Sequence, residues 1–505
     1  MLKFISKRLI ASLGILLAAS FLLYVLVINS GDPLAGLRES IADNRDYLMA
    51  QRSDYMNLDQ PWYQRYWTWL VGVAGCFALK CDLGTNINGV EVNGMLAAAA
   101  ASTMRLVVLA TVLAAIFGIA IGVLTAIRQY SGLDYGVTFL TFLFFSLPVF
   151  WAAVMLKEYM AIGYNDWMKD PAFSTVQIIV IALLVGFVMQ VFLAGSLRRR
   201  VITFIVSAAF IGVAIPYLLW LNFFRYPQLG PAAIVLLSLA VALSATAVSV
   251  GVRNKQVLYP ALIAVALGLG IYYASFSMLK SPTTLMLVIG GILSVLIPGA
   301  IGYFMGGRLR KVAMTVSAVT GFVFAGLTVV DHIFRAWPGF LALKPRPIAT
   351  IGSQTPNFTG DFWEIFLDRG AQLLLPTILL AVISLASYSR YTRSSMLEVG
   401  QQDYIRTARS KGLSERTVIF RHAFRNALIP IATIAAFDFA GLIGGAVITE
   451  AVFGWKGMGE MFRTGLTAVD PAPVMAFFLV TGSAAVLFNM LADIFYALLD
   501  PRIRV

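Results

Sequence analysis

The chain has 505 residues, of which 59% are hydrophobic and only 12% charged, and its mean hydropathy is +0.82. Soluble globular domains carry about a quarter charged residues. Apolar runs of about 20 residues recur along this chain, and each is long enough to cross a bilayer as a helix. The composition therefore excludes a soluble protein and predicts an all-α polytopic membrane protein. Basic residues collect in the cytoplasmic turns of such proteins, so the net charge of +13 indicates no nucleic-acid partner.

The apolar runs predict twelve transmembrane helices with both termini in the cytoplasm. We interpret the first run, at about 9–29, as an uncleaved span, because its apolar core is longer than the ~7–15 residues of a signal peptide. An outer segment follows to about residue 100. Pro148 lies inside the third run and predicts a kink there. The other spans are predicted at about 104–126, 136–156, 174–195, 201–222, 231–251, 257–279, 284–305, 312–334, 371–389, 427–449 and 474–498.

Charge is distributed unevenly over the turns of the central spans. The turns predicted to be cytoplasmic carry eight basic residues, and the intervening turns carry two, which fits the positive-inside rule. The eight are Arg198, Arg199, Arg200, Arg253, Lys255, Arg308, Arg310 and Lys311, and the two are Arg225 and Lys280. No Asp or Glu occurs from Pro171 to Val330. We therefore expect this central block to lack a carboxylate for proton coupling.

Cys76 and Cys81 are the only cysteines, and both lie in the predicted outer segment. On an oxidising face of the membrane we expect a loop disulfide between them, and two free thiols are the alternative. A Cys-x4-Cys pair without a nearby histidine is a poor zinc site. His332 and His422 are the only histidines and are far apart in sequence, so we predict no metal site.

Asp438 lies in the middle of the apolar run at about 427–449. An ionisable residue inside a membrane span is a functional-site hypothesis by default. Asp438 is therefore a candidate for the translocation path, where it would meet a substrate amine. A buried hydrogen bond between subunits is an equal alternative.

The hydrophobic chain is interrupted at 403–430 by a polar stretch, "DYIRTARSKGLSERTVIFRHAFRNALIP". Immersing its six basic residues in hydrocarbon would cost on the order of 15–20 kcal/mol, so the stretch is predicted to be cytoplasmic. Tyr404, Ile405 and Ala408 fall on one side of a short helix, Gly412 ends that helix, and Ser414 caps a second one. Physical chemistry alone favours a surface-lying connector between two spans.

The same string resembles the cytoplasmic EAA-loop region of ABC importer permeases of the oligopeptide/dipeptide permease family. The run Arg406-Thr407-Ala408, followed by Gly412, occupies the EAA-x-x-x-G position, with Arg406 in place of the glutamate. Further resemblances follow in order and reach both ends of the chain: "MLKFISKRLIASLGILLAASFLLYVL", "LDQPWYQRYWTWL" with "DLGTN", "GLDYGVTFLTFLFFSLPVFW", "LLLPTILLAVISLASYSRYTRSSMLEV", "GGAVITEAVFGWKGMG" and "LADIFYALLDPRIR".

The resemblance implies a six-helix type I ABC importer permease core with about six helices inserted between its third and fourth spans. The implied parts are a first span and outer segment at 1–100, core spans at 101–164, an inserted membrane block at 165–340, and core spans with a coupling loop (394–426) at 341–505. An even number of inserted spans leaves the coupling loop on the cytoplasmic side. The residues implied to contact an ATPase are Tyr404, Arg406, Thr407, Ala408, Lys411, Gly412 and Leu413. The insert itself is either a lipid-facing bundle or a binding surface for an accessory subunit or lipid.

The function implied is that of a permease subunit of an ATP-driven importer, moving oligopeptides or dipeptides across the cytoplasmic membrane of a prokaryote. The chain is not expected to be an enzyme or to bind a cofactor, because ATP and magnesium would bind on partner ATPase subunits. The implied partners are a second homologous permease, two ATP-binding subunits, an extracytoplasmic substrate-binding protein and membrane lipid. The alternatives are a proton-coupled twelve-span secondary transporter and an ABC permease for another small solute, such as a nickel complex.

Overall fold

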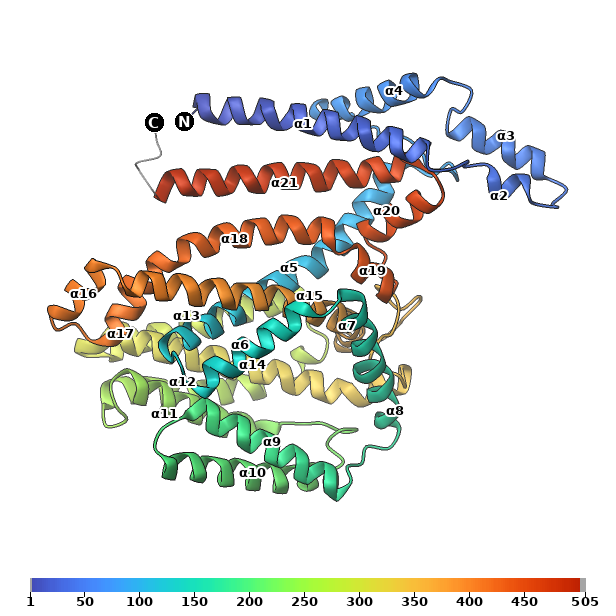
Figure 1. Ribbon diagram of the computed structural model, residues 1–505. Coiled ribbons are helices and arrows are strands. Elements are labelled where there is room, and N and C mark those ends of the chain that lie inside the picture. The colour runs from blue at the N-terminus through green and yellow to red at the C-terminus, as the bar shows by residue number, and fades with distance from the viewer. Residues whose placement is uncertain (1, 500–505) are drawn as a thin grey trace. The chain divides into compact units, whose positions relative to one another are not determined.

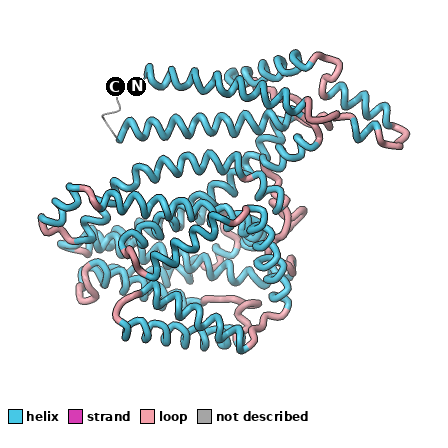
Figure 2. The backbone as a smooth tube through the Cα atoms, in the orientation of Figure 1, coloured by secondary structure: helices cyan, strands magenta, loops and turns pink. Residues whose placement is uncertain are grey.

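The computed structural model describes residues 2–499, and these residues fold as helices joined by loops, the longest of which lies between α14 and α15 (Figures 1 and 2). Extended pairing in this range is limited to an isolated bridge between Thr85 and Glu91. Among the described residues, ten helices are long and apolar enough to span a membrane, and the number rises to twelve if each of two bent helix pairs forms one span. The predicted all-α polytopic class is confirmed.

The chain divides into two compact units. Unit 1 comprises residues 1–161, 350–353 and 372–505, and unit 2 comprises residues 162–349 and 354–371. The predicted insert at 165–340 falls inside unit 2, which also takes in most of the outer loop up to residue 371.

Unit 1 contains the N-terminal and C-terminal helices. Its helices are α1 (Leu2–Ile28), α2 (Ala35–Arg38), α3 (Arg45–Tyr55), α4 (Trp62–Gly75), α5 (Val92–Ile127), α6 (Gly132–Ser146), α7 (Val149–Leu156), most of α15 (Phe362–Gly400), α16 (Asp403–Ser410), α17 (Glu415–Thr417), α18 (Phe424–Gly445), α19 (Val447–Phe453), α20 (Met458–Thr467) and α21 (Pro471–Leu499). π-helical turns at Lys157–Gly163 and Val418–Ala423 follow α7 and α17.

The core of unit 1 forms where α5 packs against α15, α18 and α21. Buried Leu106 and Ala110 of α5 share one apolar cluster with Ile443 of α18 and Phe477 of α21. Two glycines bring α15 close to α5, since a Cβ atom at Gly118 would lie 2.6 Å from the Cβ of Tyr388, and one at Gly122 would lie 2.5 Å from that of Thr392. Small residues of this kind let membrane helices approach closely.

Pro148 breaks the predicted span at 136–156 completely. The segments Gly132–Ser146 and Val149–Lys169 meet at 104°, as a broken span or a re-entrant loop. Proline has no N–H for the helix ladder, and here Pro148 is the N-cap residue of a new helix, with an extended backbone (φ −60°, ψ 130°). The interruption predicted at Pro148 is therefore present, and it is a full break rather than a kink within a continuous helix.

Unit 2 contains six long apolar helices at the predicted positions. Its helices are α8 (Tyr164–Lys169), α9 (Thr175–Leu193), α10 (Leu197–Trp220), α11 (Gly230–Ser249), α12 (Lys255–Ser275), α13 (Thr284–Met305) and α14 (Arg310–Leu343). Positions of the predicted spans agree with α9 to α14 because each run is bounded by charged or turn-forming residues.

Asp331 directly follows the acid-free run from Pro171 to Val330, lies on α14 and is fully buried. One of its carboxylate oxygens accepts the backbone N–H groups of Leu229 and Gly230, both at 2.9 Å. The other accepts the Tyr272 hydroxyl at 2.9 Å and the Arg335 Nε at 2.8 Å. Asp331 thus joins the start of α11 to α12 and α14. Its carboxylate accepts four hydrogen bonds, so its role is structural.

Candidate functional site

The predicted coupling loop forms a short amphipathic helix, α16, whose apolar side packs against the ends of α5 and α15. Ile405 is fully buried and Ala408 is 7% exposed. Both join a cluster with Val123 of α5, Met396 of α15 and Val418 of the π-turn. Because these contacts reach the ends of two spans, α16 is attached to the span bundle rather than lying free beside it.

A glycine ends α16 at the predicted position. Gly412 has φ +73°, a left-handed conformation that L side chains rarely adopt, and the place of its absent Cβ is open space. The Ser414 side chain then accepts the backbone N–H of Thr417 and caps the next helix. Arg409 and Glu415 form an ion pair of 2.7 Å across this turn, so the turn is held from both sides.

The residues implied to contact an ATPase lie on both faces of α16. The exposed ones are Tyr404, Arg406, Thr407, Lys411, Gly412 and Leu413, whereas Ala408 is packed inside. The assignment of Tyr404 to the apolar side was wrong, because Tyr404 is 42% exposed. Its hydroxyl accepts a 2.8 Å hydrogen bond from Asn426 Nδ2, which holds the polar end of the ring outside the apolar cluster.

Asp438 lies on α18 next to two hydroxyl groups of α15. Its Oδ1 accepts the Ser384 hydroxyl at 3.2 Å. The hydroxyl of Tyr388, which is 1% exposed, lies near the same carboxylate and interacts with it. Asp438 forms no ion pair in the described part of the chain. Sequence reasoning found Asp438 but missed Ser384 and Tyr388, whose spacing of four residues places both hydroxyls on one face of α15.

A second buried carboxylate, Glu450 of α19, was missed by the sequence reasoning. It accepts the Thr103 hydroxyl of α5 at 2.6 Å and the backbone N–H groups of Gly459 at 2.7 Å and Glu460 at 3.1 Å. Burial raises the pKa of Glu450, and these hydrogen bonds oppose the rise. A Cβ atom at Gly457 would lie 2.4 Å from the Glu450 carboxylate, so the glycine-rich turn "FGWKGMG" closes tightly over it.

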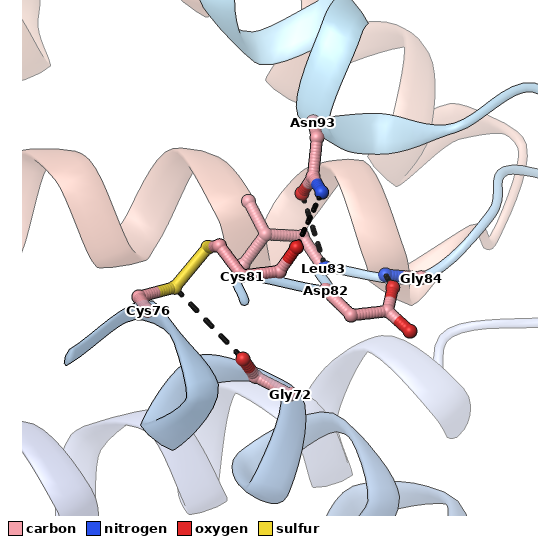
Figure 3. Close-up of a disulfide and its surroundings, with 7 residues drawn as sticks. All are labelled: Gly72, Cys76, Cys81, Asp82, Leu83, Gly84 and Asn93. Carbon is pink, nitrogen blue, oxygen red and sulfur yellow. Dashed lines mark hydrogen bonds between the residues drawn. A yellow bond between two sulfur atoms is a disulfide. The ribbon is translucent and has the colours of Figure 1, made fainter. Parts of the chain in front are cut away.

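Cys76 and Cys81 are joined by a disulfide, with an S–S distance of 2.04 Å (Figure 3). Asn93, at the start of α5, holds the end of this loop by donating to Cys81 O at 2.8 Å and accepting the Leu83 N–H at 3.1 Å (Figure 3). The disulfide loop is thereby attached to the first turn of α5.

The all-helical fold, the long apolar spans and the docked amphipathic loop between α15 and α18 define a polytopic membrane protein. Residues 294–505 match the family described as the binding-protein-dependent transport system inner membrane component. The chain belongs to this family.

Several curated proteins are similar to the chain. The oligopeptide transport system permease protein OppB of Mycobacterium tuberculosis (strain ATCC 25618 / H37Rv) is 38% identical over 228 residues, covering 44% of this chain and 69% of that protein. The oligopeptide transport system permease protein AppB of Bacillus subtilis (strain 168) is 36% identical over 233 residues, 45% of this chain and 71% of that protein. The dipeptide transport system permease protein DppB of Escherichia coli (strain K12) is 43% identical over 139 residues, 28% of this chain and 41% of that protein. These similarities do not favour the alternative of a proton-coupled secondary transporter.

Proposed function

We propose that this chain is a permease subunit of an ATP-driven ABC importer that moves oligopeptides or dipeptides across the cytoplasmic membrane of a prokaryote. The chain aligns with more than two thirds of the length of two permeases named for oligopeptide transport. The observation that carries the proposal is the docked loop between α15 and α18, because it gives a membrane permease an exposed polar surface rigidly joined to its spans.

In this proposal the exposed side of α16 binds an ATP-hydrolysing subunit. Its contact residues are Tyr404, Arg406, Thr407, Lys411, Gly412 and Leu413, while Ala408 acts through packing. A movement of the ATPase would pass through Ile405 and Ala408 to Val123 and Met396. Close-packed apolar contacts of this kind transmit displacement because they have little free volume.

ATP and magnesium would bind on partner subunits, and this chain would bind no cofactor of its own. The assembly would comprise a second homologous permease, two ATP-binding subunits and an extracytoplasmic substrate-binding protein. The eight basic residues in alternate turns of unit 2 support an orientation with both termini in the cytoplasm.

Asp438, with Ser384 and Tyr388 beside it, is the residue we assign to the substrate path. The Asp438 carboxylate lies beside the hydroxyls of Ser384 and Tyr388 and forms no ion pair among the described residues. The ammonium group of a peptide would supply the missing positive charge, and an intramembrane carboxylate is costly without one.

Substituting Gly412 tests the coupling role. Gly412→Leu strains a left-handed backbone position, so we expect the assembled transporter to lose most ATP-driven uptake. Gly251→Leu is the matched control, because Gly251 also has a positive φ (+87°) and open space around it, but lies in the turn between α11 and α12. Equal uptake by the Gly412→Leu and Gly251→Leu transporters would contradict the coupling assignment.

A further inference from the structure

Unit 1 contains a cavity of about 320 Å³ between α5, α6 and α15. Its lining is amphipathic and combines hydroxyl and guanidinium groups with apolar side chains. The lining residues are Thr125, Val137, Thr138, Thr141, Phe142, Ser389, Arg390, Arg393, Ser394 and Leu397. A volume of this size is typical of a small-ligand site.

The two arginines of the cavity differ in how their charge is balanced. Arg393 makes a bidentate ion pair with Asp134, with distances of 2.7 and 2.9 Å, so its charge is neutralised. Arg390 is exposed and has no carboxylate within ion-pair distance among the described residues. Its guanidinium carbon lies 5.0 Å from the ring centroid of Phe145 and 5.4 Å from that of Tyr391. Ring stacking fixes the guanidinium plane while its edge N–H groups stay free for an anion.

An exposed apolar face of α6 adjoins the cavity. Phe139, Phe142 and Phe145 are 67%, 55% and 58% exposed, and they recur every three residues along α6. A free inorganic anion would leave this face uncovered, whereas an acyl chain would cover it.

The cavity lies near the ends of its helices that, in the proposed orientation, are cytoplasmic. Thr125 is close to the end of α5 at Ile127, and α15 continues past Leu397 toward the coupling loop. This level is therefore the boundary between headgroups and acyl chains of the inner leaflet, and basic pockets between helices at this depth suit anionic lipid headgroups.

We propose that this cavity binds the phosphate of an anionic phospholipid of the cytoplasmic leaflet. Arg390 and the hydroxyls of Thr138, Ser389 and Ser394 hold the headgroup phosphate, and one acyl chain lies along the exposed face of α6. The leaflet assignment rests on the proposed orientation, and the chemistry of the site rests on the cavity itself. A bound lipid would fix α6 against the part of α15 that leads into α16.

Native mass spectrometry of the assembled transporter, after exchange into micelles containing phosphatidylglycerol or phosphatidylcholine, tests the site. We expect retained phosphatidylglycerol on the wild-type transporter and at least a fivefold loss of this adduct in Arg390→Gln. Thr138→Phe, which fills the cavity and keeps Arg390, should cause a similar loss. Arg253→Gln, a basic residue of a turn in unit 2, is the matched control and should retain the lipid.

Two results would overturn the proposal. One is equal phosphatidylglycerol retention by the wild-type and Arg390→Gln transporters when both elute at the same size. The other is complete displacement of the lipid by millimolar inorganic phosphate, which would show that the acyl chain contributes nothing. Neither result depends on ATP-driven uptake, so failure of the lipid site and failure of the coupling role are distinguishable.

Discussion

The hydroxyl of Thr103 donates a 2.6 Å hydrogen bond to the carboxylate of Glu450, joining α5 to α19 across 347 residues of sequence. The same hydroxyl accepts the backbone N–H of Met458 at 2.8 Å. One threonine and one glutamate thus hold the turn between α19 and α20 on the first half of α5.

Glu450→Gln should destabilise unit 1 by about 1–3 kcal/mol. Glutamine has one acceptor oxygen where glutamate has two, so it cannot accept the Thr103 hydroxyl and the N–H groups of Gly459 and Glu460 together, and a buried donor loses its acceptor. Removing a buried charge recovers only part of this loss. The thermal unfolding temperature of the detergent-solubilised protein measures the effect. Glu460→Gln is the control, since Glu460 pairs with a half-exposed Arg463, and exposed pairs contribute about 0–1 kcal/mol. A Glu450→Gln protein as stable as this control would contradict the prediction.

Asp470 should make stability fall as pH rises between about pH 4 and pH 6. Burial raises the pKa of Asp470 from its ordinary 3.8 to about 6, against the opposing hydrogen bonds from the backbone N–H groups of Ile87 and Ala472. The folded state therefore binds this proton more tightly than the unfolded state. The resulting stabilisation is fully present below the unfolded pKa and is lost as pH rises through the folded pKa, on the order of 2–3 kcal/mol.

Thermal unfolding of the wild type and of Asp470→Asn, compared across this pH range, isolates the contribution of Asp470. Asparagine does not titrate, so the difference between the two proteins should change between about pH 4 and pH 6 and stay constant above this range. A difference independent of pH throughout would show that Asp470 titrates normally in the folded protein.

Asp331→Asn should destabilise unit 2 by about 3 kcal/mol, because it leaves the partly buried Arg335 without its counter-charge. Asp166→Asn is the control, since Asp166 pairs with Lys169 at an exposed position and should leave the unfolding temperature unchanged. Limited proteolysis of the turn between α10 and α11, whose end is held by Asp331 through Leu229 and Gly230, gives a local measure. Cleavage at the wild-type rate in Asp331→Asn would show that the hydrogen bonds of Asp331 to Leu229 and Gly230 are dispensable.

Asp438→Asn should reduce uptake of peptides with a free amino terminus by about tenfold, equivalent to about 1.4 kcal/mol, and leave uptake of N-acetylated peptides nearly unchanged. Ser384→Ala, which removes one hydrogen bond to Asp438 but keeps its charge, should have a smaller effect on both. Uptake of both peptide classes at wild-type rates in Asp438→Asn would remove Asp438 from the substrate path and leave it a structural role.

The positions of the long helices could be predicted from the sequence because hydropathy and turn charge are local properties. The six helices α9 to α14 lie close to the predicted ranges for this reason. The stop at Gly412 was also predictable, since a glycine between two amphipathic segments marks a left-handed helix end. The break at Pro148 was underestimated because periodicity shows that a proline interrupts a helix, and the surrounding packing decides the angle.

The buried carboxylates depended on contacts between distant parts of the chain. Asp331 ends an acid-free run of the sequence, yet its role comes from donors on α11, α12 and α14. Likewise, Tyr404 lies at the right helical spacing for the apolar side of α16, but a hydrogen bond to Asn426 holds it outside.

By itself, the sequence determined the membrane class, the approximate span positions, the family resemblance and the polar loop, because each is a property of neighbouring residues. Only the tertiary structure decided that Tyr404 stays outside the buried face of α16, which hydroxyls lie beside Asp438, and which carboxylates join distant helices. Those relationships join residues tens to hundreds of positions apart, and a buried polar group is satisfied only by what the fold brings to it.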